Sequence, residues 1–126
     1  GGDHLAGFDR LPFGPVFARA AAIVCHAGIG TLTLALGTGR PTLAVPFPLH
    51  DQHDNALRAR RTGAAEVLPA GRFEADAAEA ILRRLVSDPA RLEATARLAA
   101  AMAREGNGAG RAADAILELG SADRPA

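Results

Sequence analysis

The segment from residue 26 to residue 31 combines a histidine, two glycines and a threonine in a pattern that suits phosphate chemistry. It reads His26-Ala27-Gly28-Ile29-Gly30-Thr31 and follows an apolar run. Gly28 and Gly30 let the backbone approach a ligand closely, because no side chain intervenes. The free N–H groups of Gly30, Thr31 and Leu32 at the start of a following helix favour an anion, as does the helix dipole. The pattern predicts a diphosphate-binding turn.

Two side chains of this turn add donors. His26 lies where a strand becomes the turn, and its ring donates to phosphate in the neutral or the protonated form. Thr31 either caps the helix or donates its hydroxyl to phosphate. The competing interpretation of the whole segment is a structural turn with two glycines and a buried histidine.

A second polar segment, His50-Asp51-Gln52-His53-Asp54-Asn55, opens a helix after a proline-rich loop. A carboxylate beside an amide suits vicinal hydroxyls, because Asp51 accepts hydrogen bonds whereas Gln52 donates and accepts them. One alternative is that Asp51 simply caps the helix. Another is a metal site of His50, His53 and Asp54, since histidines three positions apart share a helix face. No flanking ligand pair supports a metal, so we expect none and interpret the segment as a polyol-binding cluster.

Three short apolar runs, at residues 22–25, 42–45 and 65–68, predict buried parallel strands. Helices are expected at residues 15–21, 32–36, 51–62, 73–86, 90–104 and 109–119, with breaks at Gly39, Gly63 and Pro89. This alternation predicts an α/β fold: a Rossmann-like parallel sheet flanked by helices, with a helical C-terminal part. Ligands bind beyond the carboxyl ends of such strands. The two polar segments follow the first and second strands and should therefore reach the same edge.

The composition narrows the class of protein. The chain has 126 residues, which predicts a single domain over 1–126, and 14 acidic residues balance 14 basic ones. That balance gives no footprint for nucleic acid or an anionic membrane. No apolar run approaches the roughly 18 residues of a membrane-spanning helix. The one cysteine, Cys25, falls in a predicted buried strand, where we expect it to pack, and fits a reducing, cytoplasmic setting.

In this order and spacing, the segments resemble the donor-binding C-terminal domain of GT-B fold glycosyltransferases. The resemblance is to the family-1 type, which includes UDP-glucosyl, glucuronosyl, sterol and macrolide transferases and bacterial relatives. It covers most of the chain and rests on residues 19–31, on Gly39-Arg40-Pro41 with Val45-Pro46, and on residues 50–56 followed by Gly63.

The resemblance implies a role for each matching residue. His26, Gly28, Gly30 and Thr31 would bind the donor diphosphate, and the pair Asp51 and Gln52 would hydrogen-bond the hydroxyls of the transferred sugar. One position departs from the family pattern, because Ala27 replaces the commoner glycine. Its methyl group is small, so we expect binding to survive.

The resemblance also implies a reaction and its limits. The reaction is hexosyl transfer, with inversion, from a UDP- or TDP-linked sugar to an acceptor hydroxyl, without a metal or other cofactor. The strands, helix and nucleobase contacts that usually open this domain would be missing before Gly1. The acceptor-binding N-terminal domain, which carries the general base, would be missing too. We therefore assign no catalytic residue and expect the chain alone to be inactive.

Two other functions compete with this one. One alternative is a non-catalytic nucleotide-binding module, or one subunit of a two-chain glycosyltransferase. A dinucleotide oxidoreductase is disfavoured, because Thr33 stands where the G-x-G-x-x-G fingerprint requires its third glycine.

Overall fold

A computed structural model describes residues 4–49 and 51–122 of the chain. Its centre is a parallel sheet of three short strands, β1 (Ile23–Cys25), β2 (Thr42–Ala44) and β3 (Ala65–Val67), in that order. All three predicted strands are confirmed, and the ladder reaches one residue further at two carboxyl ends. There the N–H groups of the following residues donate to the neighbouring strand, Val45 to Cys25 and Leu68 to Ala44.

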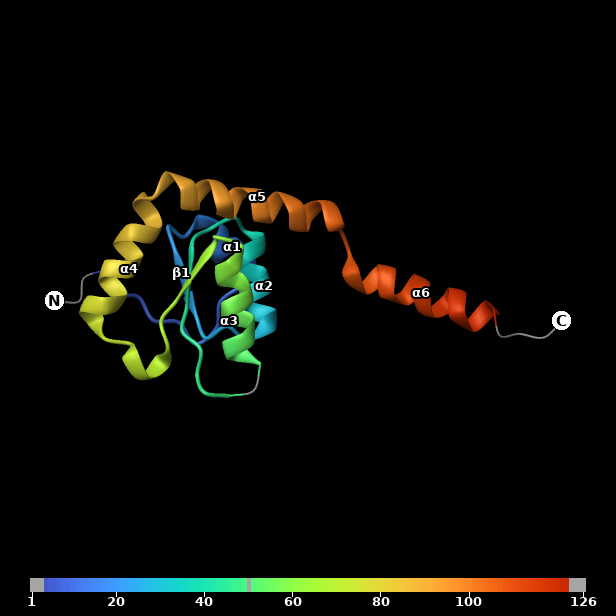
Figure 1. Ribbon diagram of the computed structural model, residues 1–126, viewed down its shortest axis with the longest axis horizontal. Helices are drawn as coiled ribbons and strands as arrows, with labels where there is room; N and C mark the ends of the chain where they lie inside the picture. The colour runs from blue at the N-terminus through green and yellow to red at the C-terminus, as the bar shows by residue number, and fades with distance from the viewer. Residues whose placement is uncertain (1–3, 50, 123–126) are drawn as a thin grey trace.

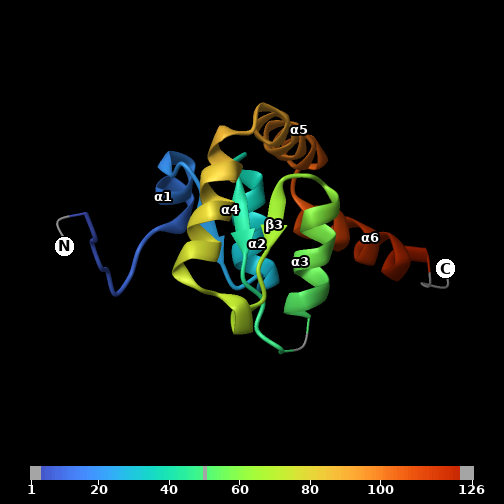
Figure 2. The ribbon, with the colours of Figure 1, turned by 60° about the vertical axis from the view of Figure 1, so that its left-hand side comes forward.

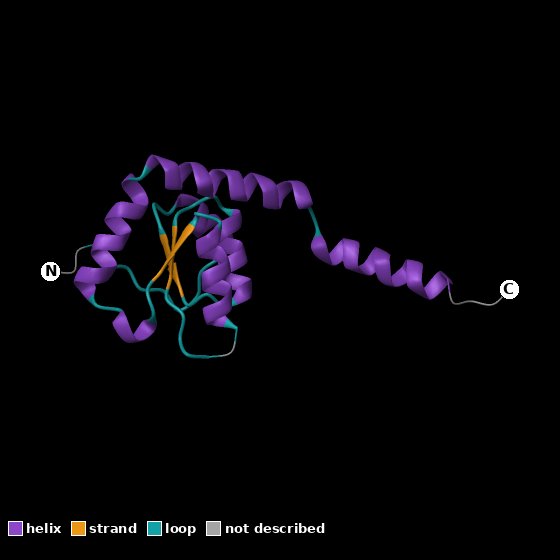
Figure 3. Ribbon diagram, in the orientation of Figure 1, coloured by secondary structure: helices purple, strands orange, loops and turns teal. Residues whose placement is uncertain are grey.

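Helices surround this sheet (Figure 3). In chain order they are α1 (Phe13–Arg19), α2 (Ile29–Gly37), α3 (Gln52–Arg61), the single 3-10 turn η1 (Ala70–Arg72), α4 (Ala75–Ser87), α5 (Pro89–Glu105) and α6 (Gly108–Ala122). The six predicted helices are confirmed, and η1 is an addition. α1 begins two residues earlier than predicted, and the rings of Phe13 and Phe17 stack one helical turn apart with centroids 5.1 Å apart. The sequence and structure agree on an α/β fold with a helical C-terminal part.

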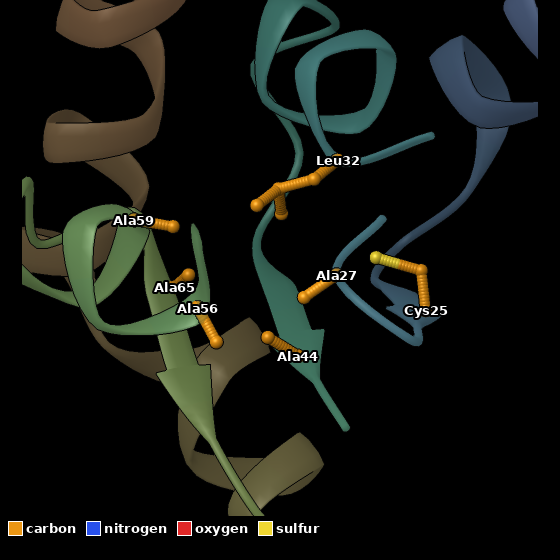
Figure 4. Close-up of a cluster of buried hydrophobic side chains, with 7 residues drawn as sticks. All are labelled: Cys25, Ala27, Leu32, Ala44, Ala56, Ala59 and Ala65. Carbon is orange, nitrogen blue, oxygen red and sulfur yellow. The ribbon is translucent and has the colours of Figure 1, made fainter. Parts of the chain in front are cut away.

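The sheet is covered on both faces, as parallel sheets require. α2 and α3 lie on one face and α4 on the other (Figures 1 and 2). Small side chains fill the space below α2 and α3, and Figure 4 shows this cluster of Cys25, Ala27, Leu32, Ala44, Ala56, Ala59 and Ala65. Larger side chains pack below α4, around Leu43, Leu68 and Leu85. The alanines allow α3 to approach the strands closely, which fixes the start of α3 near the sheet edge.

α5 closes the amino ends of the strands. It packs against the two turns that lead into β2 and β3, at Gly39 and Gly63. Both glycines have positive φ, +70° and +79°, as predicted for left-handed caps. A Cβ at Gly63 would lie 3.2 Å from the Cβ of Ala94 in α5, so the close approach also favours glycine there. Because α5 occupies the amino ends, the opposite, carboxyl edge is the one available for a ligand.

The C-terminal helix α6 extends away from the body (Figure 1). It follows a break at Gly106, which has a φ of +69° and ends α5, in the interval between the helices predicted at residues 90–104 and 109–119. Three apolar side chains of α6 are strongly exposed: Ile116 (68%), Leu117 (71%) and Leu119 (73%). Within residues 4–49 and 51–122, no helix is long and apolar enough to cross a membrane.

Candidate functional site

The carboxyl ends of β1 and β2 are neighbours, and each leads into one of the two polar segments. β1 ends at Cys25 and β2 at Ala44, and these residues pair in the sheet. The loops after the two strands therefore leave the same edge side by side. A direct contact joins the segments, since Nδ2 of Asn55 donates to the carbonyl oxygen of Ala27 at 3.2 Å. The predicted meeting of both segments at one edge is what the structure shows.

His26 and Gly28 form a packed pair at the start of the turn. The His26 side chain is exposed rather than buried, which is contrary to the purely structural interpretation of the turn. Its ring lies directly over Gly28: a Cβ there would lie 3.2 Å from Cδ2 and 3.3 Å from Cε1 of His26, and closer still to Nε2. The backbone of Gly28 (φ −60°, ψ 135°) suits any residue. A side chain at residue 28 would displace the exposed His26 ring, and glycine lets the ring occupy this position.

Ala27 adopts the left-handed conformation, with φ of +65°, and is fully buried. It is the only residue other than glycine with positive φ in the described part of the chain. An L-residue pays about 1–2 kcal/mol for this conformation, which explains why glycine suits the position. The methyl group of Ala27 is buried in the small-residue cluster beneath α2 and α3, and this burial offsets part of that cost (Figure 4). The expectation that binding survives this alanine stays a prediction.

The start of α2 offers unpaired backbone donors. Gly28 is the N-cap residue, and no side chain caps the helix. Among the described residues, no acceptor bonds to the N–H groups of Ile29, Gly30 or Thr31. The N–H of Leu32 already donates to the carbonyl of Gly28 at 2.9 Å, so the prediction that it is free was wrong. Three adjacent N–H groups at the positive end of the helix dipole form an anion-binding arrangement.

Thr31 and Gly30 lie in the first turn of α2. Thr31 is the third helical residue, so it is too far along to be the cap, and only the predicted role of its hydroxyl as a phosphate donor remains. Gly30 faces open space: no atom lies within 4 Å of the position of a Cβ. The fold itself therefore gives no steric reason for glycine at residue 30.

Asp51 precedes α3 but does not cap it with its side chain. Its backbone is already helical (φ −87°, ψ −10°), and its carboxylate accepts no bond from the helix N–H groups. Instead, Oδ2 accepts a hydrogen bond from Nδ2 of Asn55 at 2.7 Å. Asp51 is thus the N-cap residue by position, but the prediction that its side chain caps α3 is wrong. The exposed carboxylate retains an oxygen that can accept bonds from a ligand.

Gln52 holds the proline-rich loop that follows β2. Its Oε1 accepts a hydrogen bond from the N–H of Phe47 at 3.1 Å, which leaves its amide N–H groups as donors. Asp51 and Gln52 together therefore present an acceptor and a donor side by side. A hollow of about 310 Å³ opens at the carboxyl ends of β2 and β3, lined by Phe47, His53 and residues of both proline-containing loops.

Asn55 is the residue of the site to which sequence reasoning gave no role. It is half-buried and uses its amide group twice, toward Ala27 and toward Asp51. Its position four residues after Asp51 was a usable signal, because residues four apart share a helix face. The bond to Ala27 spans 28 positions in the chain and could not be inferred from spacing.

The neighbouring ionisable side chains point elsewhere. Asp54 pairs with Arg58 at 2.6 Å on the surface of α3, where Arg60 and Arg61 are also exposed. His50, needed for the alternative metal site, lies outside the described residues. Within the described part of the chain, no group of three histidine, cysteine or carboxylate side chains could hold a metal ion.

Cys25 is buried at the end of β1, as predicted. Burial raises the pKa of its thiol above the ordinary value of 9.0, and a hydrogen bond from the backbone of Ala27 lowers it by a smaller amount. A thiol with a raised pKa carries little thiolate at neutral pH, which is typical of a packing residue rather than a nucleophile.

Comparison with known proteins places this geometry in a family. Residues 3–116 match the family "Erythromycin biosynthesis protein CIII-like, C-terminal domain". A UDP-N-acetylglucosamine--N-acetylmuramyl-(pentapeptide) pyrophosphoryl-undecaprenol N-acetylglucosamine transferase of Rhizobium etli is 33% identical over 103 residues, which are 74% of this chain and 28% of that protein. The chain thus spans little more than a quarter of that relative's length.

Solved structures show the same likeness. The glycotransferase of kitacinnamycin is 31% identical, with a TM-score of 0.76 over 85% of this chain and 27% of that chain. The glycosyltransferase VinC, solved in complex with DTDP, is 34% identical, with a TM-score of 0.72 over 77% of this chain and 24% of that chain. The chain therefore belongs to the EryCIII-like C-terminal domain family and has the C-terminal domain fold of GT-B glycosyltransferases.

Proposed function

We propose that this chain binds the donor of a glycosyl transfer, a nucleoside diphosphate sugar linked to UDP or TDP. The diphosphate lies at the start of α2, where Gly30 and Thr31 donate through backbone N–H groups and Thr31 adds its hydroxyl. The ring of His26 donates to the same oxygens from above Gly28. Asp51 and Gln52 bind the hydroxyls of a hexose. One observation carries this proposal: the uncapped helix start and the acceptor–donor pair lie at one sheet edge, joined through Asn55.

The relatives support a diphosphate ligand. VinC, which is 34% identical over 77% of this chain, was solved with DTDP bound. A diphosphate with several negative charges suits three aligned N–H groups at a helix start. A sugar attached to it extends the ligand beyond the turn, and the neighbouring Asp51 provides the acceptor that sugar hydroxyls require.

The reaction that we propose is transfer of the hexose to an acceptor hydroxyl with inversion. A general base takes the proton of the acceptor hydroxyl, its oxygen bonds to the anomeric carbon, and the bond from that carbon to the diphosphate breaks. The diphosphate departs with the bonding electrons and gains negative charge. The N–H groups of α2 and the His26 ring stabilise this charge, which lowers the barrier electrostatically.

The acceptor-binding part and the general base come from outside these 126 residues, from another region of the protein or from a partner chain. We assign the base role to none of the described histidines. If no acceptor-binding part exists, donor binding without transfer is the alternative function.

Titration calorimetry with TDP, TDP-glucose, UDP and UDP-glucose tests donor binding, on this chain and on the longest form that its gene encodes. We expect binding either of TDP and TDP-glucose or of UDP and UDP-glucose. The phosphorus NMR signals of the bound nucleotides should shift. Replacement of His26 by Ala should lower the affinity about tenfold, as loss of a hydrogen bond to a charged group does. The exposed His4 is the matched control, and its replacement by Ala should change nothing. Failure of the longest form to bind any of the four ligands would overturn the proposal.

A further inference from the structure

We propose that Asn55 is a positioning residue that couples the diphosphate-binding turn to the sugar-binding carboxylate, so that the two halves of the donor are bound as a unit. The inference rests on the function proposed above. Asn55 itself needs no contact with the ligand. It acts through the two residues that its amide group holds, Ala27 and Asp51.

Both hydrogens of the Asn55 amide are committed. Nδ2 donates to the carbonyl oxygen of Ala27 at 3.2 Å and to Oδ2 of Asp51 at 2.7 Å. The helix explains the second bond, since Asn55 lies four residues after Asp51, and its own N–H donates to the Asp51 carbonyl at 2.9 Å. The close packing of α3 on the sheet explains the first, because Ala56 and Ala59 are buried against the strands.

The bond to Ala27 orients the backbone of the phosphate turn. Ala27 is held in the left-handed conformation, which an alanine does not favour by itself. In a planar trans peptide, the N–H of the next residue points opposite to the carbonyl. When Asn55 fixes the Ala27 carbonyl toward α3, it therefore fixes the Gly28 N–H in the opposite direction. The direction in which α2 begins follows from the same peptide plane.

The bond to Asp51 orients the carboxylate that accepts sugar hydroxyls. Asp51 is exposed, and a free side chain at that position would sample several rotamers. One oxygen is bound to Asn55 and the carboxylate plane is thereby restricted, while Oδ1 is left to the ligand. Preorganisation of this kind raises affinity because the side chain loses less freedom on binding.

The amide chemistry of asparagine is specific for this task. Aspartate at residue 55 has the same shape but no hydrogens to donate, and it would place a second carboxylate against Asp51. Alanine removes both bonds. Each replacement should therefore disturb the diphosphate turn and the sugar carboxylate together, whereas loss of Asp51 disturbs the sugar side alone.

The test compares the full chain, wild type and variants, in titrations with TDP and TDP-glucose, or with UDP and UDP-glucose if the wild type prefers them. We expect Asn55→Ala to weaken TDP about fivefold, the effect of one hydrogen bond, and TDP-glucose about twenty-five-fold, the effect of two. The preference for the sugar nucleotide should therefore fall about fivefold. Asn55→Asp should give at least the same loss.

A second comparison separates the effects of the two Asn55 hydrogen bonds, to Ala27 and to Asp51. In an Asp51→Ala background, Asn55→Ala should lower the affinity for both ligands by the same factor, because only the hydrogen bond to Ala27 remains to be lost. Arg58→Ala is the matched control: it breaks another side-chain pair between residues four apart on α3, with Asp54, and should leave both affinities unchanged. Thermal melting of each variant reports on the fold.

The outcomes separate the inference from the proposed function. A wild type that binds neither ligand overturns both. A wild type that binds, with an unchanged preference for the sugar nucleotide in Asn55→Ala and Asn55→Asp, overturns only the inference. Loss of cooperative melting in both variants also overturns only the inference, since Asn55 would then serve the stability of the fold rather than the site.

Discussion

The two glycines of the turn after β1, Gly28 and Gly30, differ in their surroundings. At Gly28 the His26 ring occupies the place of a side chain, so a larger residue would displace the ring. Gly30 has open space around it, lies within α2 and has no positive φ. Glycine inside a helix costs about 0.5–1 kcal/mol relative to alanine, and the fold of this chain gains nothing visible in exchange. A ligand that approaches the Gly30 backbone closely would explain the residue.

Gly30→Ala should therefore stabilise the protein and weaken nucleotide binding. We expect a gain of about 0.5–1 kcal/mol in the free energy of unfolding and about a tenfold loss of affinity, because the new methyl group would displace a phosphate oxygen. Thermal unfolding and calorimetric titration measure the two effects. Gly37→Ala, at the other end of α2, is the matched control: its new Cβ would lie 3.7 Å from Cε of Met102, an ordinary contact. This variant should stabilise the protein without affecting nucleotide binding. Equal affinity for wild type and Gly30→Ala would remove Gly30 from the site.

At the scale of elements, the site edge is free because α5 is fixed to the opposite edge. The Arg91 guanidinium on α5 donates to the Glu66 carboxylate of β3 at 2.6 Å and to the carbonyls of Gly63 and Ala65. The two charged side chains are only 19% and 18% exposed. One nitrogen of Arg91, Nε, is buried without a partner, so the group depends strongly on its remaining bonds.

Arg91→Met should destabilise the chain by about 2–3 kcal/mol, because it leaves the Glu66 carboxylate largely buried and unpaired. Urea unfolding measures the change. The control is Arg97→Met on the same helix, which breaks an exposed pair with Glu93 (66% and 69% exposed) and should cost less than about 1 kcal/mol. A combined replacement of Arg91 by Met and Glu66 by Leu should recover part of the loss. Similar losses for Arg91→Met and Arg97→Met would contradict an anchoring role.

For the whole molecule, α6 is distinct from the body that holds the site. It extends outward in both views (Figures 1 and 2). Its apolar side chains at residues 116, 117 and 119 are exposed. The body, by contrast, is closed by α5, whose Leu98 and Met102 line a groove against α2 and α3. The stability of the body should therefore depend on α5 and not on α6.

Removal of residues 106–126 should change the free energy of unfolding by less than about 0.5 kcal/mol, as changes to exposed parts do. It should also reduce self-association, because it removes exposed apolar side chains. Chemical denaturation and light scattering check the two expectations. Removal of residues 98–126 is the contrast: it takes away Leu98 and Met102 and should destabilise the body clearly. A large loss on the shorter truncation would show that α6 packs on the body in solution.

Much of the architecture follows from local sequence patterns. The three apolar runs form the strands, Asp88 and Pro89 start α5 with a side-chain cap at 3.0 Å, and Gly39 and Gly63 end helices with positive φ. These features depend on neighbouring residues only, so their positions can be predicted from them. The parallel topology then brings the loops after β1 and β2 to one edge. Local patterns and the parallel order of the strands are therefore enough to predict the fold class and the sheet edge that carries the candidate site.

How the candidate site is held together follows from contacts that form only in the folded chain. Three features depend on side-chain rotamers and on contacts through space. They are the hydrogen bond between Asn55 and Ala27, the position of the His26 ring over Gly28, and the hydrogen bond of Asp51 to Asn55 in place of a cap on α3. Sequence spacing does not encode which of several compatible partners a polar side chain selects. That choice is made when α3 packs against the sheet, and it brings residues 27 and 55 within hydrogen-bonding distance.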